Sequence, residues 1–189
     1  MKIHLLGPSG SGTSTLGKLI AGKYEVPWFD SDDLFWIKTD PPFTVKRDIN
    51  ERTLLLRKTL SEHDSWVLSG SALGWGDFIR ECIDIAIYKY VEPGQRLERL
   101  LKRERQRYGG RIESGGDMYE SSRQFIDWAM QYEKGGMDMR SAESETAWLE
   151  GLSCPVIKLE RVMPAEKELD LVFSEIARLI PGRNKYGIV

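Results

Sequence analysis

Short apolar runs alternate along the chain with longer stretches of helical periodicity, a pattern typical of an α/β protein with a parallel sheet. Five of the runs are expected to form strands, at residues 3–6, 26–29, 65–69, 83–91 and 156–159. The stretches between them are expected to form helices, at residues 13–24, 45–61, 95–108, 117–133 and 141–150, and a last helix should begin at Pro164 and end before Pro181. The sequence therefore predicts a single α/β domain that spans residues 1–189.

The helical periodicity also indicates which side of each helix faces the core. The expected buried positions are Ile49, Leu55, Leu56 and Leu60 in the helix at 45–61, and Leu97, Leu100 and Leu101 in the helix at 95–108. Asp117 lies three residues before Glu120, which is the spacing of an N-cap with its reciprocal acid. We therefore expect Asp117 to begin the helix at 117–133.

Composition restricts the function classes without choosing one. The 189 residues carry a formal net charge of −2, so no overall field attracts nucleic acid or an anionic membrane, and nucleic-acid binding is not expected. Cys82 and Cys154 form no metal-binding pattern and are expected to be small core residues. The N-terminal apolar run is too short for a signal peptide. We expect a cytoplasmic monomer or homodimer that does not bind membranes.

A glycine-rich loop follows the first expected strand and precedes the first expected helix. The phosphate-binding P-loop has the pattern GxxxxGK[ST], in which backbone N–H groups and the start of the helix surround a phosphate. Gly7, Gly12 and Ser14 fit that pattern. The expected nucleotide-binding residues are therefore Gly7, Pro8, Ser9, Gly10, Ser11, Gly12, Thr13, Ser14 and Thr15.

Thr13 stands where the pattern has lysine. That lysine neutralises charge on the terminal phosphates, and the loss of a comparable donor in other enzymes costs about 10²–10³ in rate. Either another cation replaces it, or the protein binds nucleotide without fast turnover. A second register, which ends at Lys18, is rejected because Leu19 follows in place of Ser or Thr.

Acidic residues follow the second expected strand, at the sheet edge where such folds bind ligands. Ser14 and Asp32 are expected to hold Mg²⁺, and Asp32 is also the expected catalytic acid–base group. Small and aromatic residues after the second and third strands can line a pocket for the phosphoryl acceptor. The expected acceptor-binding residues are Asp30, Asp33, Trp36, Gly70 and Ser71.

Arginines are concentrated in and after the helix at 95–108. Arg96, Arg99, Arg103 and Arg107 recur at helical spacing, and a glycine-rich segment follows them. Planar cations on a segment that can close are what phosphoryl transfer requires. The expected catalytic arginines, any of which can replace the missing lysine charge, are Arg103, Arg107, Arg111 and Arg140.

A different ligand class remains open. The run GPSGSGTST is similar to a dinucleotide-binding GxxGxxG turn that has lost its last glycine, and Asp30 lies about 20 residues on, where such a fold carries its ribose-binding acid. This alternative predicts that the protein binds NAD(P), but it leaves the arginine-rich region unexplained.

Two known groups share these motifs. The stretch GPSGSGTSTLGKLIAGKYEVPWFDSDD resembles the start of shikimate kinases and other small P-loop kinases. In shikimate kinases the first acid of such a DxD pair supports the metal shell and the second contacts the acceptor hydroxyl, which implies these roles for Asp30 and Asp32. The stretches DDLFW, WVLSGS and IDIAIYKYVEPGQRLERLLKRERQRYGGR are similar to adenylate-kinase-like proteins called DNA topology modulation proteins.

The resemblance implies a three-layer α/β/α P-loop NTPase fold with a five-stranded parallel sheet of the nucleoside-monophosphate-kinase type. Residues 33–64 then correspond to an acceptor-binding insertion and residues 103–140 to a lid. The segment 161–164 is where these folds hold the adenine. The expected function is ATP-dependent, Mg²⁺-dependent phosphoryl transfer to a nucleotide or a small hydroxylated metabolite. These relatives carry the loop lysine, and Thr13 departs from them.

Overall fold

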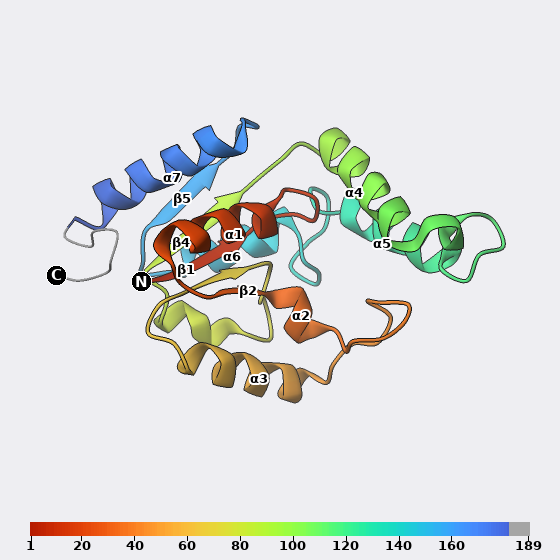
Figure 1. Cartoon of the computed structure of the whole chain (residues 1–189), viewed down its shortest axis with the longest axis horizontal. Helices are drawn as coiled ribbons and strands as arrows, with labels where there is room; N and C mark the ends of the chain where they lie inside the picture. Colours follow the sequence, from red (N-terminus) through yellow and green to blue (C-terminus); the bar gives the residue numbers. More distant parts are fainter. Residues whose placement is uncertain (182–189) are drawn as a thin grey trace.

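The computed structural model describes residues 1–181 and forms one twisted parallel sheet with helices on both faces (Figure 1). The strand order is β2-β3-β1-β4-β5. The strands are β1 (Lys2–Leu6), β2 (Trp28–Asp30), β3 (Trp66–Ser69), β4 (Ile85–Lys89) and β5 (Val156–Leu159). All five predicted strands are present. Residues 182–189, the end of the expected domain 1–189, lie outside the described residues.

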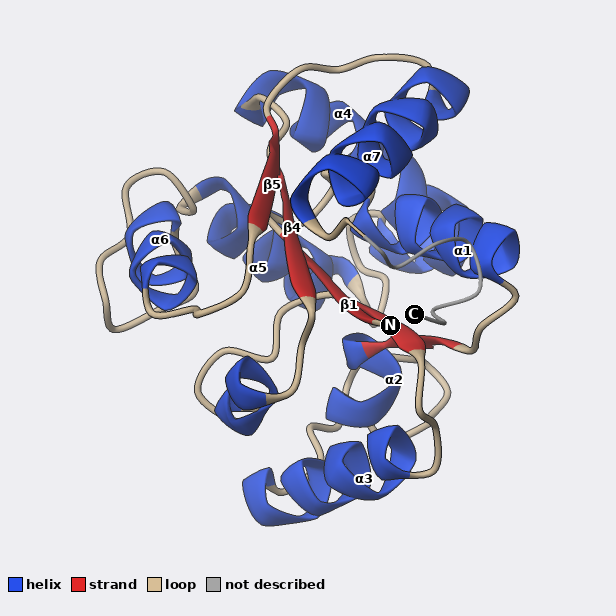
Figure 2. Ribbon diagram, turned by 90° about the vertical axis from the view of Figure 1, so that its left-hand side faces the viewer, coloured by secondary structure: helices blue, strands red, loops and turns tan. Residues whose placement is uncertain are grey.

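The helices form two layers, one on each side of the sheet (Figure 2), and one projecting arm (Figure 1). α1 and α7 cover one face of the sheet, α3 and α6 cover the other, and α4 and α5 project beyond the carboxyl ends of the strands. Their bounds are α1 (Thr13–Tyr24), α2 (Ser31–Phe35), α3 (Ile49–Ser61), α4 (Pro93–Tyr108), α5 (Tyr119–Met130), α6 (Ala142–Glu150) and α7 (Ala165–Leu179), with 3-10 turns at η1 (Asp77–Glu81) and η2 (Gly109–Ile112). The predicted three-layer α/β/α fold is confirmed.

Each face of the sheet has its own apolar core. Alternate residues of a strand point to opposite faces. In β4, Ile85 and Ile87 pack with α1 and α7, whereas Ala86 and Tyr88 pack with the α3 and α6 side. The central strands are therefore buried on both faces, which explains why they are nearly continuous apolar runs in the sequence.

The strand order decides between the two ligand hypotheses that share a glycine-rich turn. In a dinucleotide-binding sheet the second strand pairs with the first. Here β2 pairs with β3, and β3 separates it from β1. The dinucleotide arrangement expected from Asp30 is therefore absent from residues 1–181.

Helix α3 begins later than the predicted boundary at residue 45. Asp48 caps it by accepting hydrogen bonds from the N–H groups of Asn50 and Glu51. The preceding residues form an extended loop instead, in which the Ile37 N–H donates to the Val45 carbonyl. Ile49 is 47% exposed, so its prediction as a buried residue is wrong.

The buried side of α4 differs from the apolar side that its sequence indicates. Leu101 is 51% exposed, and the residues that face inward recur every fourth position: Arg96, Leu100, Glu104 and Tyr108. The reason is that α4 packs on α5 through polar contacts, such as the hydrogen bond of 2.9 Å from Ser122 to Glu104. Leu101 was expected on the buried side of this helix and Arg96 on its arginine side. The structure reverses both, because Leu101 is exposed and Arg96 is buried.

Asp117 is not the cap of α5. The helix begins after Met118, without a side-chain cap. Asp117 instead accepts two hydrogen bonds from the Arg111 guanidinium, at 2.9 and 2.5 Å. The carboxylate that the sequence assigned to the helix start is thus turned to the Arg111 side chain instead.

Cys82 and Cys154 are both partly buried free thiols packed against the core on the α3 and α6 side. Their expected role as small core residues is therefore confirmed. Within residues 1–181, no helix has the length and apolarity that a membrane span requires.

The central strand β1 buries one histidine, and this makes stability depend on pH. The His4 Nδ1 lies 3.2 Å from the Leu68 carbonyl, while Nε2 has no partner among the described residues. Burial lowers the pKa of His4 from 6.5 to about 4. Between these values the unfolded chain binds a proton that the folded protein does not, so stability falls as pH falls.

We expect the protein to be about 2 kcal/mol less stable at pH 5 than at pH 7 because of His4. Urea denaturation of the wild type and of His4→Gln at both pH values measures this difference. His63→Gln, at an exposed histidine, is the control and should keep the wild-type dependence. Equal losses in His4→Gln and the wild type would contradict the assignment.

Candidate functional site

The glycine-rich loop has a backbone that only glycine tolerates at its first position. Gly7 follows β1 directly and has φ = 147°. An added Cβ there would lie 2.1 Å from the Lys89 carbonyl oxygen at the end of β4. Gly10 and Gly12 also have positive φ, at 84° and 93°. These angles form a tight loop between β1 and α1. The sequence predicts this order of strand, loop and helix.

The loop delivers the chain into the N-terminus of α1. Its N-cap, Gly12, provides no side-chain acceptor for the first-turn N–H groups. Those groups carry the positive end of the helix dipole. The Thr13 carbonyl, at the first helical position, accepts a hydrogen bond of 3.2 Å from Ser69 at the end of β3. The helix start is thereby fixed to the sheet with its N–H groups available to an anion.

Arginines hold the outer side of this loop. Arg140 donates to the Gly7 carbonyl, Arg96 to that of Ser9 at 3.5 Å, and Arg99 to that of Gly10 at 3.3 Å. The three carbonyls belong to the loop. Arg96 and Arg99 come from α4, and Arg140 comes from the segment before α6. The loop is therefore held in shape by its surroundings before any ligand binds, which lowers the entropic cost of binding.

Ser14 and Asp30 form the oxygen pair that best suits a divalent cation. The Ser14 hydroxyl donates to Asp30 Oδ2 at 2.6 Å, and Asp30 Oδ1 accepts from the Asp32 N–H at 3.1 Å. Burial raises the pKa of Asp30, and the bond from Ser14 opposes that shift. Hard oxygen donors of this kind fit Mg²⁺, which keeps several waters and is held through few protein ligands. In the described part of the chain, no group of three or more His, Cys, Asp or Glu side chains is arranged to hold a metal ion.

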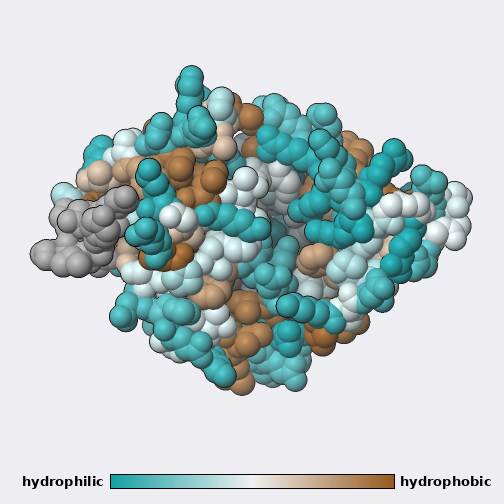
Figure 3. All heavy atoms as spheres, in the orientation of Figure 1, coloured by the Kyte–Doolittle hydropathy of each residue, from teal (hydrophilic) through white to brown (hydrophobic). Residues whose placement is uncertain are grey.

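A cavity of about 1210 Å³ opens between the sheet edge and the arm formed by α4 and α5. Figure 3 shows it as a hollow in the middle of the molecule. It brings together most of the residues predicted from the sequence. The predicted residues that line it are Gly7, Pro8, Ser9, Gly10, Ser11, Gly12, Thr13, Ser14, Thr15, Asp30, Asp32, Trp36, Gly70, Ser71, Arg103, Arg107 and Arg140.

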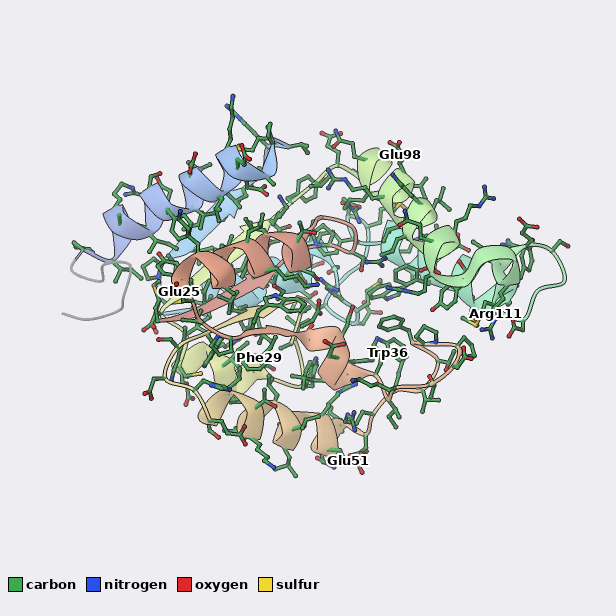
Figure 4. The ribbon with its side chains drawn as sticks, viewed as in Figure 1. Glu25, Phe29, Trp36, Glu51, Glu98 and Arg111 are labelled. Atoms are coloured by element: carbon green, nitrogen blue, oxygen red, sulfur yellow. The ribbon has the colours of Figure 1, made fainter. Side chains whose placement is uncertain are left out.

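Two predicted site residues lie outside the cavity. Asp33 is exposed on α2 and is absent from the lining. Arg111 lies at the far end of the arm, as Figure 4 shows, where it contacts Asp117 and Asp40. The structure therefore does not bring Arg111 to the loop, because its guanidinium ties the arm to the segment that precedes α3.

Arg103 and Arg140 are the arginines best placed to act on a bound anion. The Arg103 Nε is buried and has no partner among the described residues. Burial and then Arg107 lower the pKa of Arg103, whereas Asp32 and Asp30 raise it. Burial would also lower the pKa of Arg140, but the Glu145 carboxylate, which it contacts at 2.8 Å, raises it above its ordinary value.

Sequence reasoning missed a cluster of cations and aromatic rings on the α3 side of the cavity. The Arg52 guanidinium lies 4.1 Å from the centre of the Phe35 ring and 5.5 Å from that of Trp75, and its Nε is buried without a described partner. Arg107 lies 4.1 Å from the centre of Phe43. All of these residues line the cavity. Arg52 lies one turn before Leu56 on the buried side of α3, and its role depends on rings from α2 and from the segment after β3, which no local pattern connects to it.

A second missed residue is Lys89. It ends the apolar strand β4, is 7% exposed and lines the cavity, where it forms an ion pair with Glu168 of α7. A charged residue at the carboxyl end of an otherwise apolar strand was the signal available in the sequence. Val162 and Met163, in the segment expected to hold adenine, line the same cavity.

Comparison with known proteins identifies one relative along nearly the whole chain and a more distant one over part of it. No family model matches it. It is 39% identical over 175 residues to the uncharacterized protein YqaC of Bacillus subtilis (strain 168), an alignment that covers 93% of this chain and 97% of that protein. The chain belongs to the YqaC family. A cytidylate kinase of Archaeoglobus fulgidus is 28% identical over 115 residues, which cover 55% of this chain and 62% of the kinase.

Solved structures support the fold of the YqaC family member described here. A gluconokinase from Sinorhizobium meliloti 1021 superposes with a TM-score of 0.55 at 16% identity, over 94% of this chain and 92% of the gluconokinase. A shikimate kinase from Acinetobacter baumannii, in complex with shikimate, superposes with a TM-score of 0.53 at 16% identity, over 92% and 93%. The fold is therefore that of small P-loop kinases, as the resemblance implied.

Because Gly7 lies so close to the Lys89 carbonyl, a methyl group added at Gly7 should lower the stability of the fold. Gly7→Ala should lower the free energy of unfolding by about 2–3 kcal/mol, because the added Cβ meets backbone at a strained φ. The control is Gly22→Ala in α1, where an added Cβ has no neighbour within 4 Å, and this should stabilise the helix by about 0.5–1 kcal/mol. Chemical denaturation measures both, and a neutral Gly7→Ala would refute the argument.

Proposed function

We propose that this protein is an ATP-dependent phosphotransferase that acts on a nucleotide or a small hydroxylated metabolite. The observation that carries the proposal is the shared cavity. A glycine-rich loop, a helix N-terminus, the carboxylates of Asp30 and Asp32 and several arginines line one space of about 1210 Å³. Such a space can hold a triphosphate and an acceptor together and exclude water between them.

The nucleotide is proposed to place its phosphates in the loop at residues 7–15. Support comes from the uncapped start of α1 and from the Ser11 hydroxyl, which is buried without a partner among the described residues. Mg²⁺ would be held by Ser14 together with Asp30, since these two side chains are in contact, rather than by Ser14 with Asp32 as the sequence alone suggested. The metal would neutralise charge on the phosphates.

The acceptor is proposed to bind on the α3 side of the cavity, within the insertion expected at residues 33–64. Aromatic rings there are interleaved with the cationic groups of Lys46, Arg52 and Arg107. Rings and guanidinium groups suit a planar or anionic molecule. Trp36, Gly70 and Ser71 remain proposed acceptor contacts because they line the same space.

For transfer, an acceptor oxygen would attack the terminal phosphorus while the bond to the leaving diphosphate breaks. Asp32 is proposed to receive the acceptor proton, since it is an exposed carboxylate that lines the cavity beside Asp30. Arg103, Arg107 and Arg140 would stabilise the charge on the transferring group from the lid region at residues 103–140. Arg111, which lies outside the cavity, is not included.

A second candidate is a nucleotide-binding protein without fast turnover. Thr13 favours it, because the cation of the P-loop pattern is absent from that position. The cytoplasmic location and the monomeric or homodimeric state stay predictions of the sequence.

Thermal-shift titration tests the proposal. MgATP or MgGTP should raise the melting temperature, whereas NADH and NADPH should not. A ligand at 100 times its Kd stabilises a protein by about 2.7 kcal/mol, which is readily measured. Acceptors are then screened by coupled detection of the diphosphate product. A protein that binds MgATP but transfers phosphate to no acceptor would support the second candidate instead.

Arg103→Met should lower kcat by roughly 10²–10³ with little change in the Kd of MgATP, because its guanidinium is proposed to act on the transferring group. Arg105→Met is the matched control, since Arg105 is exposed on the same helix and lies outside the cavity. Steady-state kinetics of both variants test this, and equal kcat values would remove Arg103 from the mechanism.

A further inference from the structure

Lys89 lies against both ends of the glycine-rich loop. It is the last residue of β4, the strand that pairs with β1. Its carbonyl oxygen closely approaches Gly7, and its Cε would lie 3.4 Å from a Cβ added at Gly12. The side chain therefore extends along the loop as far as the glycine that precedes Thr13, the position at which the P-loop pattern has lysine.

The surroundings make lysine a costly residue at this position. Ile85 and Ile87, which point to the same face of the sheet, belong to the core beneath α1 and α7. Lys89 is 7% exposed and Glu168 only 5% exposed, and the two form a buried ion pair that lines the cavity. Buried pairs of this kind contribute little net stability compared with apolar residues. Stability alone therefore gives a weak reason for Lys89.

The arginines that reach the loop are bonded to its carbonyl oxygens. Arg96 is fully buried and bonded to the Val91 and Ala129 carbonyls as well as to Ser9. Arg99 donates to Gly10 from outside, and Arg140 donates to Gly7 and Glu145. Lys89 differs from them because its side chain passes Gly12 at Cε while its ammonium group has the Glu168 carboxylate, and not a loop carbonyl, as its partner.

We propose that Lys89 supplies the positive charge that Thr13 does not, and that it binds the terminal phosphates of a nucleoside triphosphate in the loop. This inference rests on the proposed nucleotide site and names a further ligand of it. An ammonium group has three donors, so Lys89 keeps Glu168 and donates the others to phosphate oxygens. No buried carboxylate is then left unpaired. The start of α7, which carries Glu168, lies over the same sheet edge as the loop (Figure 1).

The test compares two variants that differ only at Lys89. Glu168→Gln removes the buried carboxylate and keeps the ammonium, so it should bind MgATP at least as tightly as the wild type. Lys89→Met/Glu168→Gln removes both charges and leaves no buried ion unpaired. By isothermal titration calorimetry, the double variant should bind MgATP at least about tenfold more weakly than Glu168→Gln, since it loses a charge-assisted hydrogen bond. Its affinity for AMP, which has no terminal phosphates, should change much less.

Two further variants separate a phosphate ligand from a structural residue. Adding Thr13→Lys to the double variant should restore MgATP affinity, because the cation then comes from the P-loop position. Lys18→Met removes a lysine of α1 that lies 4.5 Å from the centre of the Trp28 ring, outside the cavity, and should leave affinity unchanged.

The outcomes are distinguishable from failure of the proposed function. If the double variant binds MgATP within about twofold of Glu168→Gln, or if Thr13→Lys restores nothing, Lys89 is not a phosphate ligand although the site binds nucleotide. If the wild type binds no nucleotide, the proposed function fails and this inference fails with it.

Discussion

The contact between the first glycine of the loop and the backbone of β4 fixes the geometry on which the site depends. Gly7 lies so close to the Lys89 carbonyl that no side chain fits between them. The loop must therefore leave β1 at one angle, and α1 begins at one place above the sheet. The bond from Ser69 to the Thr13 carbonyl then ties that helix start to β3. The two strands that pair with β1, namely β3 and β4, thus position the N-terminus of α1.

Polar packing has a similar effect on the arm. The inward side of α4 carries Arg96 and Glu104, and both are satisfied by buried partners. Half-satisfied buried groups are costly, so such an interface tolerates few alternative arrangements. The arm can therefore present Arg103, whose Nε lacks a described partner, at a fixed place over the cavity. A purely apolar interface would permit more rotation of the helix about its axis.

The sequence predicted the layers, the strands and the glycine-loop and strand-end part of the cavity lining, because period, glycine spacing and strand-end acids are local signals. It failed where partners distant in sequence decide. Leu101 was expected inside because leucine is apolar, whereas the partners of Arg96 on α5 and the loop place that arginine inside instead. Arg52 was missed for the same reason, because its significance lies in its contact with Phe35. Lys89 had a local signal, a charge at the end of an apolar strand, but that signal does not indicate its neighbours Gly12 and Glu168.

The arm is attached differently at its two ends. Its base is held by the fully buried Arg96, whereas its tip touches the segment before α3 through a bond of 2.8 Å from Tyr108 to the Pro42 carbonyl and through the exposed pair of Arg111 with Asp40. Exposed ion pairs are weak and are screened by salt. The tip can therefore detach before the base does, and a hinge motion of the arm about Arg96 becomes easier as ionic strength rises while the folded core stays intact.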